Sequence, residues 1–133
     1  MIVLDTHVLL WFAEDHPRLG PTTIALTDAA LRRDEAMVSA MSFWEIAMLA
    51  ARGRVQLDVP PAMLRQRALR QGIREVPLSG AIGIGAAELR RFHGDPADRM
   101  IVATSLSLGA QLMTADRRIL RWEGRLRTHD ARR

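Results

Sequence analysis

Four carboxylates are the residues of this chain best placed to do chemistry. Asp5, Glu45, Asp98 and Asp116 each stand where an apolar run gives way to the start of a helix, although they are spread over most of the chain. In a parallel α/β sheet every strand-to-helix junction opens on the same edge, so these acids can meet at one point. Like charges that close cannot all stay ionised unless a cation joins them. The pattern therefore predicts a site for a divalent metal ion.

The side chains available as ligands narrow the choice of ion. The chain contains no cysteine, and its four histidines show no paired spacing of the kind that favours zinc. Hard carboxylate oxygens suit Mg²⁺ or Mn²⁺. One or two such ions can activate a water and stabilise the leaving oxygen of a phosphodiester. Thr6 and Thr114 flank the predicted site and are candidates to hold a carboxylate or a water.

Each acid also has an ordinary structural explanation. Asp5 and Asp116 can serve as helix caps or turn residues. Ser42 and Glu45 have the spacing of a capping box. Asp98 lies in the first turn of a predicted helix, where the helix dipole favours an acid. The placement that all four share, rather than any one of them, favours the metal site.

The elements that carry these residues alternate between short strands and helices. Apolar runs predict strands at 1–4, 36–40, 73–78 and 110–114, with a candidate edge strand at 125–129. Helices are expected at 7–13, 21–33, 42–52, 61–71, 79–92, 96–108 and 117–121. This alternation predicts an α/β fold with a central parallel sheet and helices on both faces. The chain shows no linker or repeat, so residues 1–133 are expected to form one domain.

Composition excludes several classes of protein. Hydrophobic residues make up 48% of the chain and charged residues 26%, as in globular proteins rather than disordered ones. All 19 basic residues are arginine, and without lysine the chain cannot build a P-loop, a protein kinase site or a Schiff base. The apolar runs are too short to span a bilayer. The N-terminus lacks the features of a signal peptide. A cytoplasmic protein without a membrane partner is expected.

Charge is distributed unevenly between the two halves of the chain. Residues 1–66 hold six arginines and eight acids, whereas residues 67–133 hold thirteen arginines and seven acids. A basic half beside an acidic pocket suits an anionic polymer that is also held through a metal ion. A solvated, arginine-rich surface is the alternative interpretation.

The motifs that carry the four acids resemble those of the PIN-domain ribonucleases, specifically the VapC-type toxins of type II toxin–antitoxin pairs. The resemblance covers nearly the whole chain and lies in Met1–Trp11, Ser39–Ile46, His93–Arg99 and Thr114–Asp116. Ala97 stands where many relatives carry an aromatic residue. That departure is expected to alter packing rather than chemistry.

The resemblance implies a PIN-like three-layer sandwich, in which helices flank a central parallel β-sheet and the first and fourth strands are adjacent. It implies an endoribonuclease that depends on Mg²⁺, or on Mn²⁺ as a substitute, and hydrolyses RNA through a metal-activated water to leave a 5′-phosphate and a 3′-hydroxyl. In this family Asp5, Glu45 and Asp98 would hold the metal, and Asp116 would complete the pocket. The resemblance also implies a homodimer and a cognate antitoxin that blocks the site, with DNA contacted only through the antitoxin.

Two further expectations rest on position and composition. Arg99, Arg117 and Arg118 lie beside the predicted acids and are candidate contacts to RNA phosphates. The predicted helices at 7–13 and 43–51 are apolar nearly all round, which indicates either a groove for an antitoxin helix or dimer contact, or full burial in the core.

Two rival functions also fit parts of the sequence. A catalytically inactive PIN-like module that binds RNA or a partner is the alternative, but a pure binder has no need of the complete acidic set. An aspartyl-nucleophile phosphatase would carry a second Asp two residues after the first, where this chain has His7, and would need a lysine.

Overall fold

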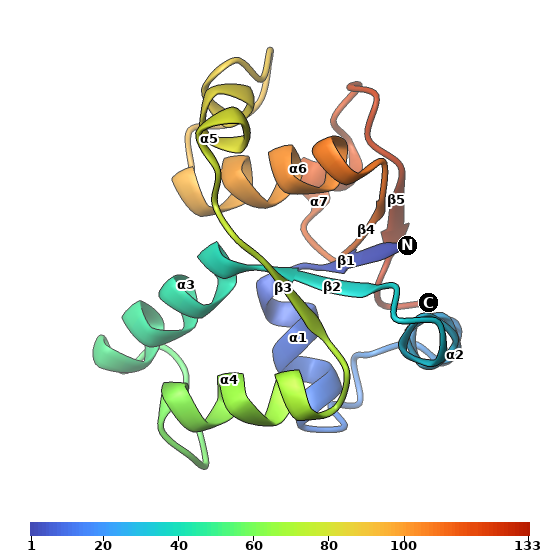
Figure 1. Cartoon of the computed structure of the whole chain (residues 1–133), viewed down its shortest axis with the longest axis vertical. Coiled ribbons are helices and arrows are strands. Elements are labelled where there is room, and N and C mark those ends of the chain that lie inside the picture. Colours follow the sequence, from blue (N-terminus) through green and yellow to red (C-terminus); the bar gives the residue numbers. More distant parts are fainter.

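The computed structural model describes all 133 residues, and its elements follow the predicted alternation (Figure 1). The strands are β1 Ile2–Leu4, β2 Ala36–Ser39, β3 Arg74–Val76, β4 Gln111–Thr114 and β5 Thr128–Asp130. The helices are α1 Thr6–Ala13, α2 Pro21–Arg32, α3 Ala40–Ala51, α4 Pro61–Arg70, α5 Gly80–Ala87, α6 Pro96–Leu108 and α7 Arg117–Leu120. None of these helices has both the length and the apolar character required to cross a bilayer.

All five strands are parallel and lie in the order β3-β2-β1-β4-β5. Leu4 of β1 is in register with Val38 of β2 on one side and with Met113 of β4 on the other. The predicted adjacency of the first and fourth strands is therefore confirmed. The chain builds the sheet outward in both directions from β1, which makes the carboxyl ends of β1 and β4 a topological switch point. Ligands bind at such points in open α/β sheets.

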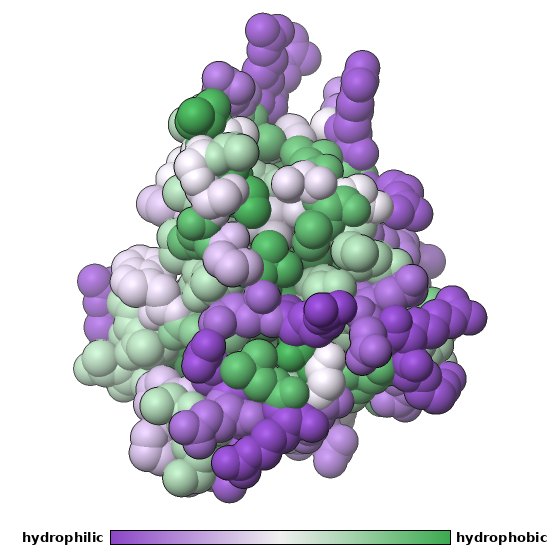
Figure 2. Space-filling view, viewed as in Figure 1, coloured by the Kyte–Doolittle hydropathy of each residue, from purple (hydrophilic) through white to green (hydrophobic).

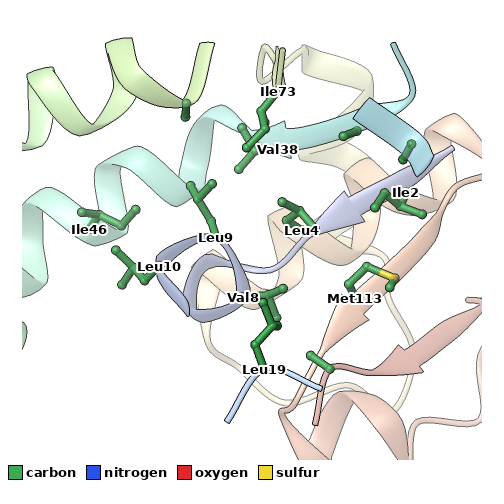
Figure 3. Packing of buried hydrophobic residues seen from close by; sticks show 14 of the residues in the cluster. Ile2, Leu4, Val8, Leu9, Leu10, Leu19, Val38, Ile46, Ile73 and Met113 are labelled. Carbon is green, nitrogen blue, oxygen red and sulfur yellow. The ribbon is translucent and has the colours of Figure 1, made fainter. Parts of the chain in front are cut away.

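The sheet is covered by helices on both faces, as predicted (Figure 1). Alternate side chains of a strand point to opposite faces, and β1 shows this directly. Leu4 packs into a core formed with α1 to α4, where Leu9 and Ile46 are also buried (Figure 3). Val3 packs on the other face with Ile101 of α6 and with α7. The three-layer arrangement sets where each strand ends, and so sets the position of the residues that follow it.

The start of α3 differs from the prediction. Ser39, not Ser42, is the N-cap, and its Oγ accepts a hydrogen bond from the Met41 N–H at 3.1 Å. The backbone at Ser39 is still extended, so the helix begins as soon as β2 ends. Ser42 lies inside the helix and is buried. The predicted capping box is therefore wrong, and Glu45 is left free of any capping role.

The helix predicted from Ser79 also ends earlier than expected. Ser79 is its N-cap, and α5 stops at Ala87 rather than at residue 92. Arg91 has φ 55°, a left-handed conformation that an α-helix does not contain. The connection 88–95 is instead an irregular segment that leads from α5 into α6.

Candidate metal centre

A pocket of about 240 Å³ at the carboxyl ends of β1 and β4 is lined by five carboxylates. Asp5 follows β1, Glu45 lies in α3, and Asp116 caps α7 directly after β4. Asp95 caps α6 and Asp98 lies in its first turn. The structure thus brings all four predicted acids to one pocket and adds Asp95. The other lining residues are Thr6, His7, Leu10, Leu49 and Arg118.

Asp5 is almost wholly buried and is held from the start of α1 and from the end of β4. Its Oδ1 accepts the Thr6 N–H at 2.8 Å, and its Oδ2 accepts the Thr114 hydroxyl at 2.6 Å. The Thr114 Oγ1 in turn accepts the Asp116 N–H at 3.0 Å. Thr114 therefore links two acids across the β1–β4 pair, while the Thr6 hydroxyl donates to Ser42 at 3.0 Å.

Asp98 is the point at which the acidic side chains gather most closely. Carboxylate oxygens of Glu45, Asp95 and Asp98 lie within 4.8 Å of one another. The same limit joins Asp98 to Asp116 and to a ring nitrogen of His93. Asp5 belongs to neither group, although it lines the same pocket. It therefore lies at the side of the cluster, with both oxygens already hydrogen-bonded.

Two acids of the cluster, Asp98 and Glu45, have a raised pKa. Burial, together with the charges of Asp5, Asp95 and Asp116, raises the pKa of Asp98 to about 6 against the opposing effect of a hydrogen bond with His93. Burial likewise raises the pKa of Glu45, and the charge of Asp98 adds to that effect. Both acids are thus held in a site where negative charge is unfavourable unless a cation is present.

Arg118 reaches the cluster from its exposed side. Its guanidinium lies 3.1 Å from Asp116 Oδ2 and 3.4 Å from Asp98 Oδ2, with 60% of the side chain exposed. Burial raises the pKa of Asp116, but the hydrogen bonds from Arg118 outweigh it and bring that pKa below its ordinary value. Arg118 therefore offsets part of the charge at the mouth of the pocket. Arg117 is also exposed, but it does not line this pocket.

His93 and Asp95 belong to this site but were not predicted as site residues, although both lie in the motif His93–Arg99. His93 Nε2 lies 2.6 Å from Asp98 Oδ2, and the Phe92 ring stacks on the imidazole with centroids 4.3 Å apart. A search for paired histidines overlooks a single imidazole that holds a carboxylate. The run His93-Gly94-Asp95 immediately before α6 was the available signal.

Arg99, a predicted phosphate contact, lies elsewhere than expected. Its guanidinium donates five hydrogen bonds, all to backbone carbonyls, at distances of 2.9 to 3.3 Å. The acceptors are Ala86, Ala87, Leu89, Phe92 and His93. A guanidinium has five N–H donors, so all are engaged within the protein. Arg99 fastens the α5–α6 connection and is not available to a phosphate in this arrangement.

The donor set fits the ion that was predicted. The pocket offers mainly carboxylate oxygens, with two nearby imidazoles, His7 and His93, and no sulfur, which suits Mg²⁺ or Mn²⁺. Five acids line it, against the single guanidinium of Arg118. That imbalance leaves room for a divalent charge, and it adds to the effect of burial in raising the pKa of Asp98.

The two apolar helices, α1 and α3, do not have the same environment. Trp44 of α3 is 54% exposed, so full burial is wrong for this residue. Phe12 of α1 is partly buried and lines a separate pocket of about 460 Å³ together with Leu9 and with Leu64 of α4. Trp11 stacks on His16 with ring centroids 5.5 Å apart. The apolar surface is thus divided between an exposed tryptophan and a pocket beside α1 and α4.

Comparison with known proteins identifies the family of this chain. Residues 2–124 match the PIN domain. Ribonuclease VapC22 from Mycobacterium tuberculosis is 37% identical over 119 residues, which cover 89% of this chain and 88% of that protein.

Solved structures share the fold at lower sequence identity. VapBC2 from Rickettsia felis, in complex with a promoter DNA fragment, aligns with a TM-score of 0.70 and 15% identity, over 97% of this chain and 98% of that chain. FitAcB from Neisseria gonorrhoeae aligns with a TM-score of 0.58 and 21% identity, over 87% and 88% of the two chains. The match to the PIN domain and the relative with 37% identity show that the chain belongs to the PIN domain family, in its VapC-type branch.

Proposed function

We propose that this protein is a metal-dependent endoribonuclease and the toxin of a type II toxin–antitoxin pair. The observation that carries the proposal is the set of five carboxylates in one pocket at the topological switch point. The relative with 37% identity is named a ribonuclease, which supports RNA as the substrate. Mg²⁺ is the proposed ion, with Mn²⁺ as a substitute.

Asp98, Glu45 and Asp95 would hold the ion, with Asp116 and Asp5 completing the pocket. When bound, the ion would make water a stronger nucleophile and neutralise charge that develops on the phosphate. The hydrogen bonds from Thr6 and Thr114 keep the Asp5 carboxylate oriented toward the pocket edge.

The remaining side chains position the acids and the substrate. His93 fixes one oxygen of Asp98, and the stacked Phe92 ring limits how the imidazole can rotate. Arg118, at the exposed mouth, can exchange its carboxylate partners for a phosphate oxygen, and the adjacent Arg117 is a second candidate. These roles place negative substrate on the exposed side and the ion on the buried side.

We propose a cognate antitoxin as the protein partner, because VapBC2 from Rickettsia felis is a complex with the same toxin fold. The exposed Trp44 and the apolar pocket that contains Phe12 are the surfaces that suit a partner helix. A homodimer, a cytoplasmic location, a single domain over residues 1–133 and DNA contact only through the antitoxin belong to the same proposal.

The test is to incubate the purified protein with total RNA in Mg²⁺, then in EDTA, and to map the cut ends. The expected result is cleavage that requires the ion and leaves 5′-phosphates. RNA binding without cleavage in Mg²⁺ and in Mn²⁺ would instead identify the inactive binding module. Cleavage that persists in EDTA would exclude the metal-dependent chemistry.

A further inference from the structure

We propose that a second pocket, beside the acidic one, binds backbone phosphates of the RNA strand on one side of the cleaved bond. This inference rests on the proposed function, because it assigns the path of the same substrate. We call this site the arginine pocket. It is lined by Arg90, Arg91, Arg118, Arg121, Trp122, Glu123 and Gly124 and has a volume of about 430 Å³.

Three of the four arginines in the arginine pocket have no ion-pair partner within the protein. Four guanidinium groups line it against one acid, Glu123. Arg118 pairs with carboxylates, but Arg90, Arg91 and Arg121 form no ion pair, and all three are exposed. Figure 2 shows hydrophilic side chains projecting at the end of the molecule where the α5–α6 connection and the segment after α7 lie. Converging like charges without a partner favour a polyanionic ligand.

The backbone beneath these side chains is held firmly. The Trp122 indole N–H donates to the Arg90 carbonyl at 2.9 Å, which fastens the α5–α6 connection to the end of α7. The Phe92 ring meets the Trp122 ring edge-on with centroids 5.3 Å apart. Arg99 donates hydrogen bonds to the carbonyls of Leu89 and Phe92, on either side of Arg90 and Arg91. The backbone that carries these arginines is thus held in place, while their exposed side chains are available to bind a ligand.

Arg118 makes the two pockets continuous. It lines the acidic pocket and the arginine pocket, and it contacts Asp98 and Asp116 directly. A strand with one phosphate at the acids therefore passes Arg118 before it reaches Arg90, Arg91 and Arg121. Guanidinium forks match the oxygens of a phosphate in pairs. This order of groups favours a nucleic acid backbone over an isolated anion.

The test compares two triple variants of the full chain. Arg90→Gln/Arg91→Gln/Arg121→Gln removes three charges from the arginine pocket. Arg32→Gln/Arg33→Gln/Arg54→Gln removes three exposed, unpaired arginines from the α1–α4 side of the sheet. Binding of a fluorescent single-stranded RNA is measured by anisotropy with Mg²⁺ at several salt concentrations, in an Asp98→Asn background that prevents cleavage. Thermal melts confirm that each variant is folded.

The pocket variant is expected to bind RNA at least about tenfold more weakly. Its plot of log affinity against log salt is expected to flatten by about 2, because each phosphate that the protein no longer neutralises lowers the slope by ~0.7. With Asp98 intact, its KM for RNA cleavage is expected to rise, whereas the control variant keeps the KM of the parent. Equal weakening in both variants would reduce the effect to net charge and overturn the proposal.

Two other outcomes separate this inference from the function on which it rests. If the parent cleaves RNA and the pocket variant binds it equally well, the arginine pocket is not the phosphate site, but the proposed function stands. If that variant loses affinity only for a co-expressed antitoxin, the pocket takes an acidic protein segment, and the proposal is overturned. If the parent neither binds nor cleaves RNA, the proposed function itself fails.

Discussion

The acidic pocket and the arginine pocket share Arg118 but are built in opposite ways. In the acidic pocket two of the charged side chains are themselves buried and held by hydrogen bonds, with Asp5 2% and Asp98 8% exposed. In the arginine pocket the backbone is fixed, and the charged ends are exposed. A metal ion requires ligands at set distances, whereas a flexible polymer is held by charges that can adapt. The contrast fits the proposal that the acidic pocket carries out the chemistry and the arginine pocket binds the substrate backbone.

The largest effect is expected when one buried carboxylate is removed from the acidic pocket. Asp98→Asn, and separately Asp5→Asn, are expected to lower the rate of RNA cleavage by at least about 10³-fold, which corresponds to ~4 kcal/mol of activation free energy. Asparagine keeps the shape and one oxygen acceptor, so the hydrogen bonds from His93 and Thr114 can persist. Initial cleavage rates in Mg²⁺ measure the effect, and circular dichroism checks the fold. Full activity in both variants would refute the assignment of the acidic pocket.

The next test compares the partly buried Arg99, whose guanidinium is fully hydrogen-bonded, with an exposed arginine. Arg99→Ala leaves five backbone carbonyls without their donor and is expected to lower the free energy of unfolding by about 2–4 kcal/mol. Arg99→Lys is expected to recover only part of that stability, because an ammonium group has fewer donors and no fork. Urea denaturation measures both.

Arg90→Ala is the matched control for Arg99. Its side chain is exposed and unpaired, so the free energy of unfolding is expected to change by less than about 0.5 kcal/mol. Similar decreases at the two positions would show that the guanidinium of Arg99 does not fasten the α5–α6 connection. A decrease in the free energy of unfolding that is confined to Arg99 would separate arginines that stabilise the backbone from arginines that are proposed to bind the ligand.

The sequence predicted the acidic pocket because strand order is a property of the whole sheet. Asp5 and Asp116 follow short apolar runs that predict strands, and parallel strands end on one edge. The adjacency of those strands came from the resemblance to the PIN family rather than from spacing, and the structure confirms it. Long-range placement was thus predictable once the order of the strands was given.

Local contacts were harder to predict than this long-range placement. Ser39 and Ser42 are both favourable caps, and only the length of β2 decides between them. The early end of α5 depends on hydrogen bonds from Arg99, which lies more than ten residues beyond Ala86. The arginine pocket depends in the same way on Trp122, which lies in the segment after α7. Side chains that organise a distant backbone leave no periodic signal in a single sequence.

The smallest of these effects is the pH dependence of stability without metal. Because the pKa of Asp98 is raised from 3.8 to about 6 in the folded protein, the folded state binds more protons than the unfolded state between these pH values. In EDTA, the free energy of unfolding is therefore expected to fall as pH rises from about 4 to about 6, by on the order of 2 kcal/mol. Thermal melts across this range measure the effect.

Asp98→Asn is the control for this pH effect, because the amide is neutral at every pH in the range. At pH 7 in EDTA the variant is expected to melt above the parent, and its decline between pH 4 and 6 is expected to be shallower. Mg²⁺ is expected to raise the melting temperature of the parent more than that of the variant, since it neutralises a charge that the variant lacks. A parent that is most stable at pH 7 in EDTA would mean that burial and the neighbouring acids do not disfavour the charged form of Asp98. The proposal of a cation in the acidic pocket would then lose its electrostatic support.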